Sequence, residues 1–191
     1  MWSLLLAAAA FAGSPRCPEP DPLGAVDTDA APDGTEYDLV ADEKVVCWWA
    51  VDPLGTPRIV HRWSKSDRYP VRIEALADGR GALIMNDGRV QLRNQDDDGY
   101  RNLAVHVSGE PVVVLAHPRR DWIAVTVARD AETTLVELLD LDKDRQLASV
   151  ALPSRDLSLS FEESQDALWI DGAHALSLSA AGLSVREQSR R

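Results

Sequence analysis

Apolar residues recur with a period of two along much of this chain, and that pattern constrains the fold more than any other feature. Leu157, Leu159 and Phe161 alternate with serines, and Leu176 and Leu178 repeat the alternation. A period of two places alternate side chains on one buried face of a β-strand. Turn residues separate such runs at intervals of roughly 8 to 12 residues, which predicts an all-β antiparallel meander.

A longer repeat lies over the strand pattern. The segments VLAHPRRDWIAV from Val114 and LSFEESQDALWI from Leu159 align without a gap, with their starts 45 residues apart. The segment IEALADGRGALI from Ile73 fits the same frame 41 residues earlier. Each segment reads as an apolar strand, a polar turn and a second apolar strand. Repeats of roughly 40 to 45 residues, each with four short strands, predict propeller blades.

Over about residues 73–188 these segments resemble the repeats of WD40-like β-propellers. The resemblance implies four-stranded antiparallel units. A less complete unit, KVVCWWAV followed by DPLGTP and RIVHRW, precedes them and brings the total to three to four blades. We therefore expect a propeller-like domain over residues 37–188, either closed into a ring or open.

One segment carries a competing pattern. Thr134 to Glu137 fits a capping box, and the leucines around it have helical spacing, which predicts a short helix from Thr134 to about Leu147. The repeat register instead places a hairpin there, with DLDKDR as its turn. The repeat also predicts that Trp122 and Trp169 occupy equivalent, largely buried positions in their blades.

The N-terminal residues predict export. Residues 1–12, MWSLLLAAAAFA, form an apolar run that ends in a small-x-small pattern typical of a signal peptide, an N-terminal anchor or buried helix being the alternative. Residues 13–36 are rich in proline and poor in large apolar side chains, which predicts a linker or tail. In an exported, periplasmic or extracellular chain, the two cysteines, Cys17 and Cys47, predict a disulfide.

Charge and hydropathy exclude two kinds of partner. Asp and Glu number 31 and Lys and Arg number 20, giving a formal net charge of -11 that repels nucleic acid and anionic lipid. No run after the signal peptide approaches the roughly 20 apolar residues of a spanning helix. We expect neither nucleic-acid binding nor a transmembrane segment after removal of the signal peptide.

The stretch NQDDDGYRN predicts a calcium loop. Its oxygen donors fall at alternating positions with Gly99 after the third, an order that resembles the loops of FG-GAP and related calcium-binding propeller repeats. Asparagine replaces aspartate at both ends of the motif, and an acidic hairpin turn is the alternative. The predicted calcium ligands are Asn94, Asp96, Asp98, the Tyr100 carbonyl and Asn102.

A second acidic stretch, DLDKD, has Asp140, Asp142 and Asp144 at alternating positions but Arg145 where a calcium loop needs glycine. We expect a solvated turn there. No nucleophile elbow, metalloprotease helix, phosphate loop or dinucleotide-binding glycine pattern occurs in the sequence.

One basic segment, RIVHRWSKSDRYPVR, interrupts the acidic chain. Arginine there can bridge carboxylates and the aromatic rings can stack on a ligand, although a solvated strand face is the alternative. The predicted patch for a protein or glycan partner comprises Arg58, Arg62, Trp63, Lys65, Arg68 and Tyr69. The sequence thus predicts an exported, non-catalytic binding or scaffold module stabilised by calcium, with a hydrolase or lyase whose site lies on loops at one end of the sheets as the alternative.

Overall fold

The computed structural model describes residues 16–20, 24–96, 99–153, 157–162, 167–171, 176–179 and 181–185. The predicted signal peptide lies outside the described residues. Within them the chain forms sixteen strands and no helix, which confirms the all-β fold class. The described part of the chain therefore contains no helix long and apolar enough to cross a membrane.

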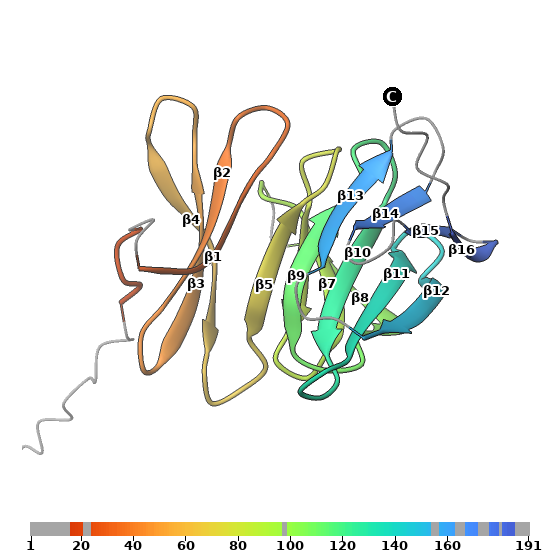
Figure 1. Cartoon of the computed structure of the whole chain (residues 1–191). Coiled ribbons are helices and arrows are strands. Elements are labelled where there is room, and N and C mark those ends of the chain that lie inside the picture. Colours follow the sequence, from red (N-terminus) through yellow and green to blue (C-terminus); the bar gives the residue numbers. More distant parts are fainter. Residues whose placement is uncertain are drawn as a thin grey trace, which may run out of the picture.

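The strands follow one another through the chain as a continuous meander (Figure 1). Their bounds are β1 (Ala25–Ala30), β2 (Glu36–Ala41), β3 (Val45–Val51), β4 (Pro57–Ser64), β5 (Pro70–Ala75), β6 (Gly81–Met85), β7 (Arg89–Arg93), β8 (Tyr100–His106), β9 (Pro111–Ala116), β10 (Trp122–Ala128), β11 (Thr134–Asp140), β12 (Arg145–Leu152), β13 (Ser158–Glu162), β14 (Ala167–Asp171), β15 (Leu176–Ser179) and β16 (Gly182–Val185).

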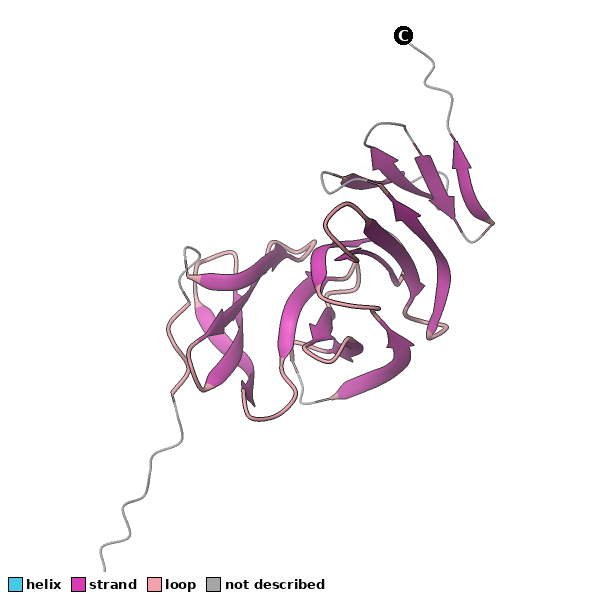
Figure 2. Cartoon of the chain, turned by 60° about the horizontal axis from the view of Figure 1, so that its bottom comes forward, coloured by secondary structure: helices cyan, strands magenta, loops and turns pink. Residues whose placement is uncertain are grey.

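Each group of four consecutive strands forms its own antiparallel sheet, and we call these sheets blades 1 to 4 in chain order. The blades follow one another along an arc, with blades 1 and 4 at its two ends (Figures 1 and 2). None of the four described sheets contains a strand from the other end of the chain. The predicted propeller-like meander is confirmed with four blades, and it is open.

The predicted domain boundary at residue 37 is wrong, because β1 lies inside the segment expected to be a linker. This strand pairs with β2 from Ala25 to Ala30 and completes blade 1. Its residues alternate between half-buried and exposed, but aspartates Asp27 and Asp29 occupy half-buried positions where a sheet usually places apolar side chains. Hydrophobic periodicity therefore gives no signal for this strand.

Two further expectations are resolved in blades 3 and 4. The segment from Thr134 to Asp140 is strand β11, so the helix prediction is wrong and the repeat register holds. Trp122 is the first residue of β10, whereas Trp169 is the third residue of β14, and both are half-buried. The two tryptophans are therefore not at equivalent positions, because the repeat aligns Trp122 with Ala167.

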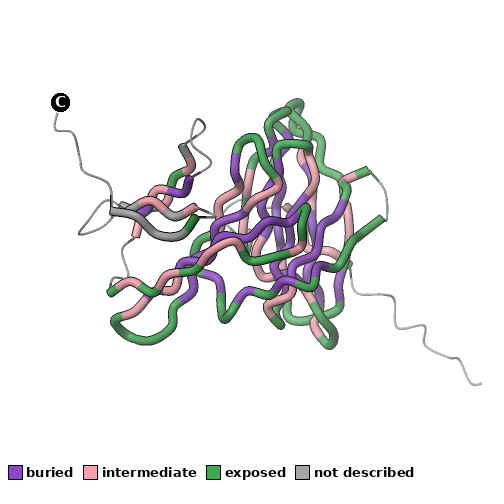
Figure 3. The backbone as a smooth tube through the Cα atoms, turned by 90° about the vertical axis from the view of Figure 1, so that its right-hand side faces the viewer, coloured by how far each residue is buried: buried purple, intermediate pink, exposed green. Residues whose placement is uncertain are grey.

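The hydrophobic core lies between neighbouring blades rather than at one centre. One cluster joins blades 1 and 2 around Trp48 and Tyr37, whose rings meet edge to face at 5.2 Å. A second joins blades 2 and 3 around Ile84 and Ile123, and a third joins blades 3 and 4 around Leu138. Buried residues run through the middle of the strands, and the turns at both ends are exposed (Figure 3).

Carboxylates link the innermost strands of the first three blades, where β5 lies between β1 and β9. Asp27 and Asp29 of β1 accept the backbone N–H groups of Ile73 and Ala75 in β5, at 2.7 and 2.6 Å. Glu74 of β5 accepts the N–H of Ala116 in β9 at 2.5 Å. Because β5 and β9 pair on one edge only, these carboxylates satisfy amides that the sheet leaves open.

A segment near the N-terminus covers the outer face of blade 1. Val46 and Trp48 of β3 face blade 2, so Cys47 and Trp49 face the opposite way. Cys47 forms the expected disulfide with Cys17, and the Trp49 indole N–H donates to the carbonyl oxygen of Pro18 at 3.1 Å. Residues 16–20 therefore lie against the face of blade 1 that no neighbouring blade covers.

Removal of the disulfide tests how firmly this segment is held. Cys17→Ser leaves the buried Cys47 in place, and we expect it to lower the free energy of unfolding by about 3 to 4 kcal/mol, the chain-entropy value for a loop of this length. Urea unfolding under oxidising conditions measures the change. A reductant is expected to lower the wild-type midpoint to that of the variant and to leave the variant unaffected; equal midpoints without reductant would contradict the prediction.

Candidate functional site at the connector face

The meander gives the sheets two different ends. One end, which we call the connector face, carries the segments 65–69 and 107–110 that lead from one blade to the next, together with turns such as 86–88. The opposite end, the turn face, carries turns such as 76–80 and the predicted calcium loop. Residues from distant parts of the sequence meet at each end because the blades stand side by side.

The predicted calcium loop lies at the turn face between β7 and β8. Tyr100 and Asn102 belong to β8, where Tyr100 pairs with Arg93, and the Asn102 side-chain oxygen accepts a hydrogen bond from Gln91 at 2.9 Å. Asn94 and Asp96 precede the gap in the described residues, and Asp98 lies outside them. The described residues contain no group of three His, Cys, Asp or Glu side chains able to hold a metal ion.

An arginine from blade 1 contacts residues of this loop. Arg58 of β4 contacts the Asp96 carboxylate at 2.9 Å and donates to the backbone oxygen of Gln95 at 2.6 Å. A calcium ion at this loop would compete with the guanidinium for Asp96. An exposed ion pair of this kind contributes only about 0 to 1 kcal/mol, so the competition is weak. The calcium site stays a prediction.

The second acidic stretch serves a structural purpose. The Asp144 carboxylate accepts the backbone N–H groups of Ala104 and Val105 in β8, at 2.8 and 2.9 Å, and these bonds contribute to the lowered pKa of Asp144. Asp140 is buried and accepts the N–H of Lys143 at 3.0 Å. The turn therefore joins blade 3 to the outer strand of blade 2 rather than gathering carboxylates around a cation.

The predicted basic patch is divided between the two ends of the sheets. Arg58 lies at the turn face, whereas Arg68 lies at the connector face and contacts the Asp87 carboxylate at 2.6 Å. Lys65 stacks over the Tyr69 ring at 5.9 Å. The remaining members, Arg62 and Trp63, lie on β4, Arg62 exposed and Trp63 buried between blades 1 and 2. The six residues do not form one surface, because antiparallel strands carry consecutive segments to opposite ends.

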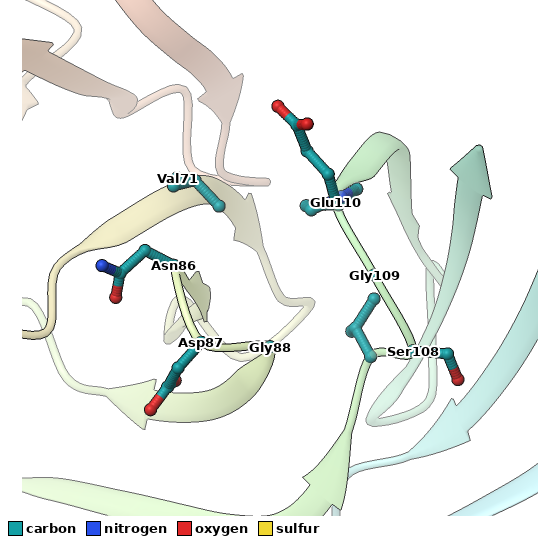
Figure 4. A pocket seen from close by; sticks show the side chains of 9 residues that line it. Val71, Asn86, Asp87, Gly88, Ser108, Gly109 and Glu110 are labelled. Atoms are coloured by element: carbon teal, nitrogen blue, oxygen red, sulfur yellow. The ribbon is translucent and has the colours of Figure 1, made fainter. Parts of the chain in front are cut away.

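A cavity of about 470 Å³ opens at the connector face between blades 2 and 3, and sequence reasoning missed it. Val71 at the start of β5 and Glu110 before β9 stand on opposite sides of its opening (Figure 4). Asn86 and Asp87 form one rim, and Ser108 lies on the other. The sequence signals that could have pointed here are the Asn-Asp-Gly turn and the Pro-Val pair that begins both β5 and β9.

Two glycines allow close packing at the rims of this cavity. Gly88 has φ +82°, and a Cβ there would lie 2.6 Å from the Val107 carbonyl oxygen. A Cβ on Gly109 would lie 2.7 Å from the side chain of Val127. The Val107 N–H also donates to the Gly88 carbonyl at 2.8 Å. The cavity is therefore built from tightly packed backbone and is formed before any ligand arrives.

The polar groups around the cavity differ in how they are engaged. Ser108 donates its hydroxyl to the buried Glu137 carboxylate at 2.5 Å, and Figure 4 shows its side chain directed away from the opening. Asp87 is paired with Arg68 and has a lowered pKa, to which hydrogen bonds and the two nearby arginines contribute. Glu110 is exposed at the opening of the cavity. The cavity lining thus presents one uncompensated carboxylate and no histidine, cysteine or lysine.

Glu74 is the most perturbed acid near this region. Burial, and to a lesser extent the charge of Asp29, raises its pKa to about 8. Its hydrogen bond from Ala116 lowers the pKa but does not offset burial. A neutral carboxyl at the boundary between blades 2 and 3 keeps the inner strands joined without a buried charge.

Comparison with known proteins identifies the fold alone. No protein-family model matches the chain, and no curated protein matches its sequence. A solved nidogen/laminin complex contains a chain 17% identical, with a TM-score of 0.59 and coverage of 83% of this chain and 61% of that one. A mitotic checkpoint complex gives 14% identity, a TM-score of 0.59 and coverage of 98% and 62%.

The virginiamycin B lyase from Staphylococcus aureus is similar at 10% identity, with a TM-score of 0.54 and coverage of 91% of this chain and 59% of that one. At such identities the likeness concerns the arrangement of sheets, and it agrees with the WD40-like repeats inferred from the sequence. This chain spans about three fifths of the length of each of these three chains.

The pKa of Glu74 predicts how stability depends on pH. Its folded pKa of about 8 lies above the ordinary value of 4.5, so the folded state holds an extra proton and the free energy of unfolding falls as pH rises across that window. Glu74→Gln keeps an oxygen for Ala116 and removes the charge. We expect the free energy of unfolding of the variant to exceed that of wild type by at least about 1 kcal/mol near pH 9 but not near pH 5.

Urea unfolding at the two pH values measures this difference. Glu36→Gln, at an exposed position of β2, is the matched control and is expected to leave the pH dependence of wild type unchanged. Parallel pH profiles for wild type and Glu74→Gln would show that Glu74 is not the group responsible.

The calcium prediction has its own test. With few carboxylate ligands, the loop is expected to bind calcium with a dissociation constant on the order of 10⁻⁴ to 10⁻³ M. About 10 mM Ca²⁺ should then raise the melting temperature by a few degrees over excess chelator. Asp98→Ala is expected to abolish the increase and Asp97→Ala, at a position between ligands, to retain it. A melting temperature that does not respond to calcium would make the loop an acidic turn.

Proposed function

We propose that the protein is an exported, non-catalytic binding or scaffold module whose connector face engages a protein partner. The observation that carries the proposal is the preformed cavity between blades 2 and 3, which presents the free carboxylate of Glu110. A well-formed cavity with a few placed polar groups is the first candidate for a binding site on a protein surface. The net charge of -11 adds an attraction for cationic partners.

Export is supported from two sides. The apolar run at residues 1–12 has the pattern of a signal peptide. The Cys17 to Cys47 disulfide suits an oxidising compartment, the periplasm or the extracellular space. Calcium is also present there at the millimolar concentration that the predicted loop would need.

The chemistry of the cavity supports binding over catalysis. Hydrolysis or elimination needs an acid and a base that converge on one substrate atom, or a nucleophile beside a base. Ser108 is hydrogen-bonded to the buried Glu137 carboxylate, but its side chain is directed away from the cavity opening, and Asp87 is paired with Arg68 (Figure 4). The alternative of a hydrolase or lyase would need its second group from outside the described lining of this cavity.

A protein partner fits the aromatic residues better than a glycan does. Sugar rings stack on exposed aromatic faces, but Trp63 is buried between blades 1 and 2. Tyr69 is half-buried and lies beside Lys65. A protein segment uses shape and charge in the cavity and does not need such a platform.

Charge reversal at the cavity tests the proposal. Immobilised wild-type protein is expected to retain a specific protein from the extracellular fraction of its host, in stoichiometric amount at about physiological salt. Glu110→Lys replaces attraction by repulsion and is expected to weaken retention at least about ten-fold. Glu36→Lys makes the same change at an exposed position of β2 on the turn face and is the matched control.

Two results would count against the proposal in different ways. A wild-type protein that retains no partner would contradict the binding function itself. A partner retained equally by Glu110→Lys would leave a binding module whose partner docks elsewhere.

A further inference from the structure

The connector face carries a second cavity at the corresponding place beside blade 3. It has a volume of about 240 Å³ and is lined by Val112 and Val113 of β9, by side chains of β10 and β11, and by Leu157 ahead of blade 4. Most of its lining is apolar, whereas the first cavity is bordered by Asn86, Asp87 and Glu110.

Repeat register shows that the two cavities are equivalent. The inner strands β5 and β9 have the sequences PVRIEA and PVVVLA, which align without a gap. Val71 and Val112 therefore occupy the same position in consecutive blades. Val71 lines the first cavity and Val112 lines the second, so each cavity lies at the same place relative to its blade.

One substitution between the repeats distinguishes the second cavity. The second-last residue of the inner strand is Asp29 in β1 and Glu74 in β5, and each accepts an amide of the next blade. In β9 that residue is Leu115, which packs into the hydrophobic cluster between blades 3 and 4. A leucine offers no acceptor for an amide of β13, so Leu115 makes no such link between the inner strands that the structure describes.

The start of β9 is more exposed to solvent than the start of β5. Val112 is 52% exposed and Val113 is 41% exposed, whereas Val71 and Arg72 at the equivalent positions of β5 are half-buried. Adjacent exposed valines beside a hollow are typical of a surface that receives a ligand. Burial of both on binding would remove apolar area from water and favour a complex.

The two cavities adjoin along the chain, since Pro111 lines the first and Val112 the second. The exposed carboxylate of Glu110 stands at the first, within a chain of net charge -11. We propose that they form one docking surface for an extended peptide segment of a partner protein. A Lys or Arg of the segment enters the first cavity, and a nearby large aliphatic side chain enters the second.

This inference rests on the proposed function and adds the chemistry of the partner. The rims at Gly88 and Gly109 are closely packed, which limits the ordering needed when the segment binds. The Glu110 carboxylate at the first cavity selects a cation, and the valines at the second select an aliphatic group. Together they define a pattern that neither cavity would select alone.

A displayed library of random linear peptides, selected on the full-length protein at about physiological salt, tests the inference. We expect enriched peptides to combine Lys or Arg with a nearby Leu, Ile, Val or Met. Synthetic copies of the enriched peptides are then titrated against variants by fluorescence anisotropy. Val112→Ser with Val113→Ser, and separately Glu110→Lys, are each expected to weaken binding at least about ten-fold.

Val26→Ser and Glu36→Lys are the matched controls. Val26 is 46% exposed on the inner strand of blade 1, and both changes are expected to alter affinity less than about two-fold. Urea unfolding verifies that every variant is folded. Exchanging the charges of Glu110 and the basic peptide residue is also informative. A peptide with Glu in place of its Lys or Arg should regain affinity for Glu110→Lys.

Several outcomes would overturn the inference. These are a selection that enriches no peptide, enriched peptides without the basic and aliphatic pair, and peptides that bind the valine and Glu110 variants as tightly as wild type. If the host partner is retained in the capture experiment while the library gives one of these results, the binding function stands and only the proposed chemistry of the docking segment fails.

Discussion

The open arc depends on carboxylates that accept backbone amides of a neighbouring blade. Asp27 and Asp29 tie blade 1 to blade 2, Glu74 ties blade 2 to blade 3, and Asp144 ties blade 3 back to the outer strand of blade 2. A strand at a sheet edge exposes N–H groups that must find partners once neighbouring blades exclude water. The acids supply these partners across the same junctions that the hydrophobic clusters fill.

Two places in the arc lack a carboxylate link of this kind among the described residues: the outer face of blade 1 and the junction of blades 3 and 4. On the outer side of blade 1 no blade follows, and the disulfide-tethered residues 16–20 cover the face instead. Between blades 3 and 4, Leu115 stands where an acid would reach across, and the hydrophobic cluster holds the sheets together. The valines at the start of β9 remain exposed there.

Repetition also explains why both cavities lie at the connector face. Every inner strand begins at that end, so the same hollow recurs beside successive blades with a different lining each time. Substitutions at the strand starts alter the chemistry of the hollow without disturbing the clusters between blades. A propeller-like scaffold can thus present neighbouring cavities of different chemistry, here one bordered by polar side chains and one lined mostly by apolar ones.

The sequence by itself determined the strands, the turns and the four-stranded repeat, because side-chain alternation and turn residues act over a few positions. It also determined the single cysteine pairing. It gave no signal for β1, whose half-buried positions include two aspartates, and it grouped basic residues that the meander sends to opposite ends.

Only the tertiary structure decided which groups meet across blades. Glu74 reaches an amide 42 residues away, and Arg58 reaches Asp96 across 38 residues. Such contacts depend on how whole sheets stack, and no local sequence pattern encodes contacts between residues so far apart in the chain. The cavities follow from the same stacking, since their walls come from strand starts and connectors that are adjacent in space but separated along the chain.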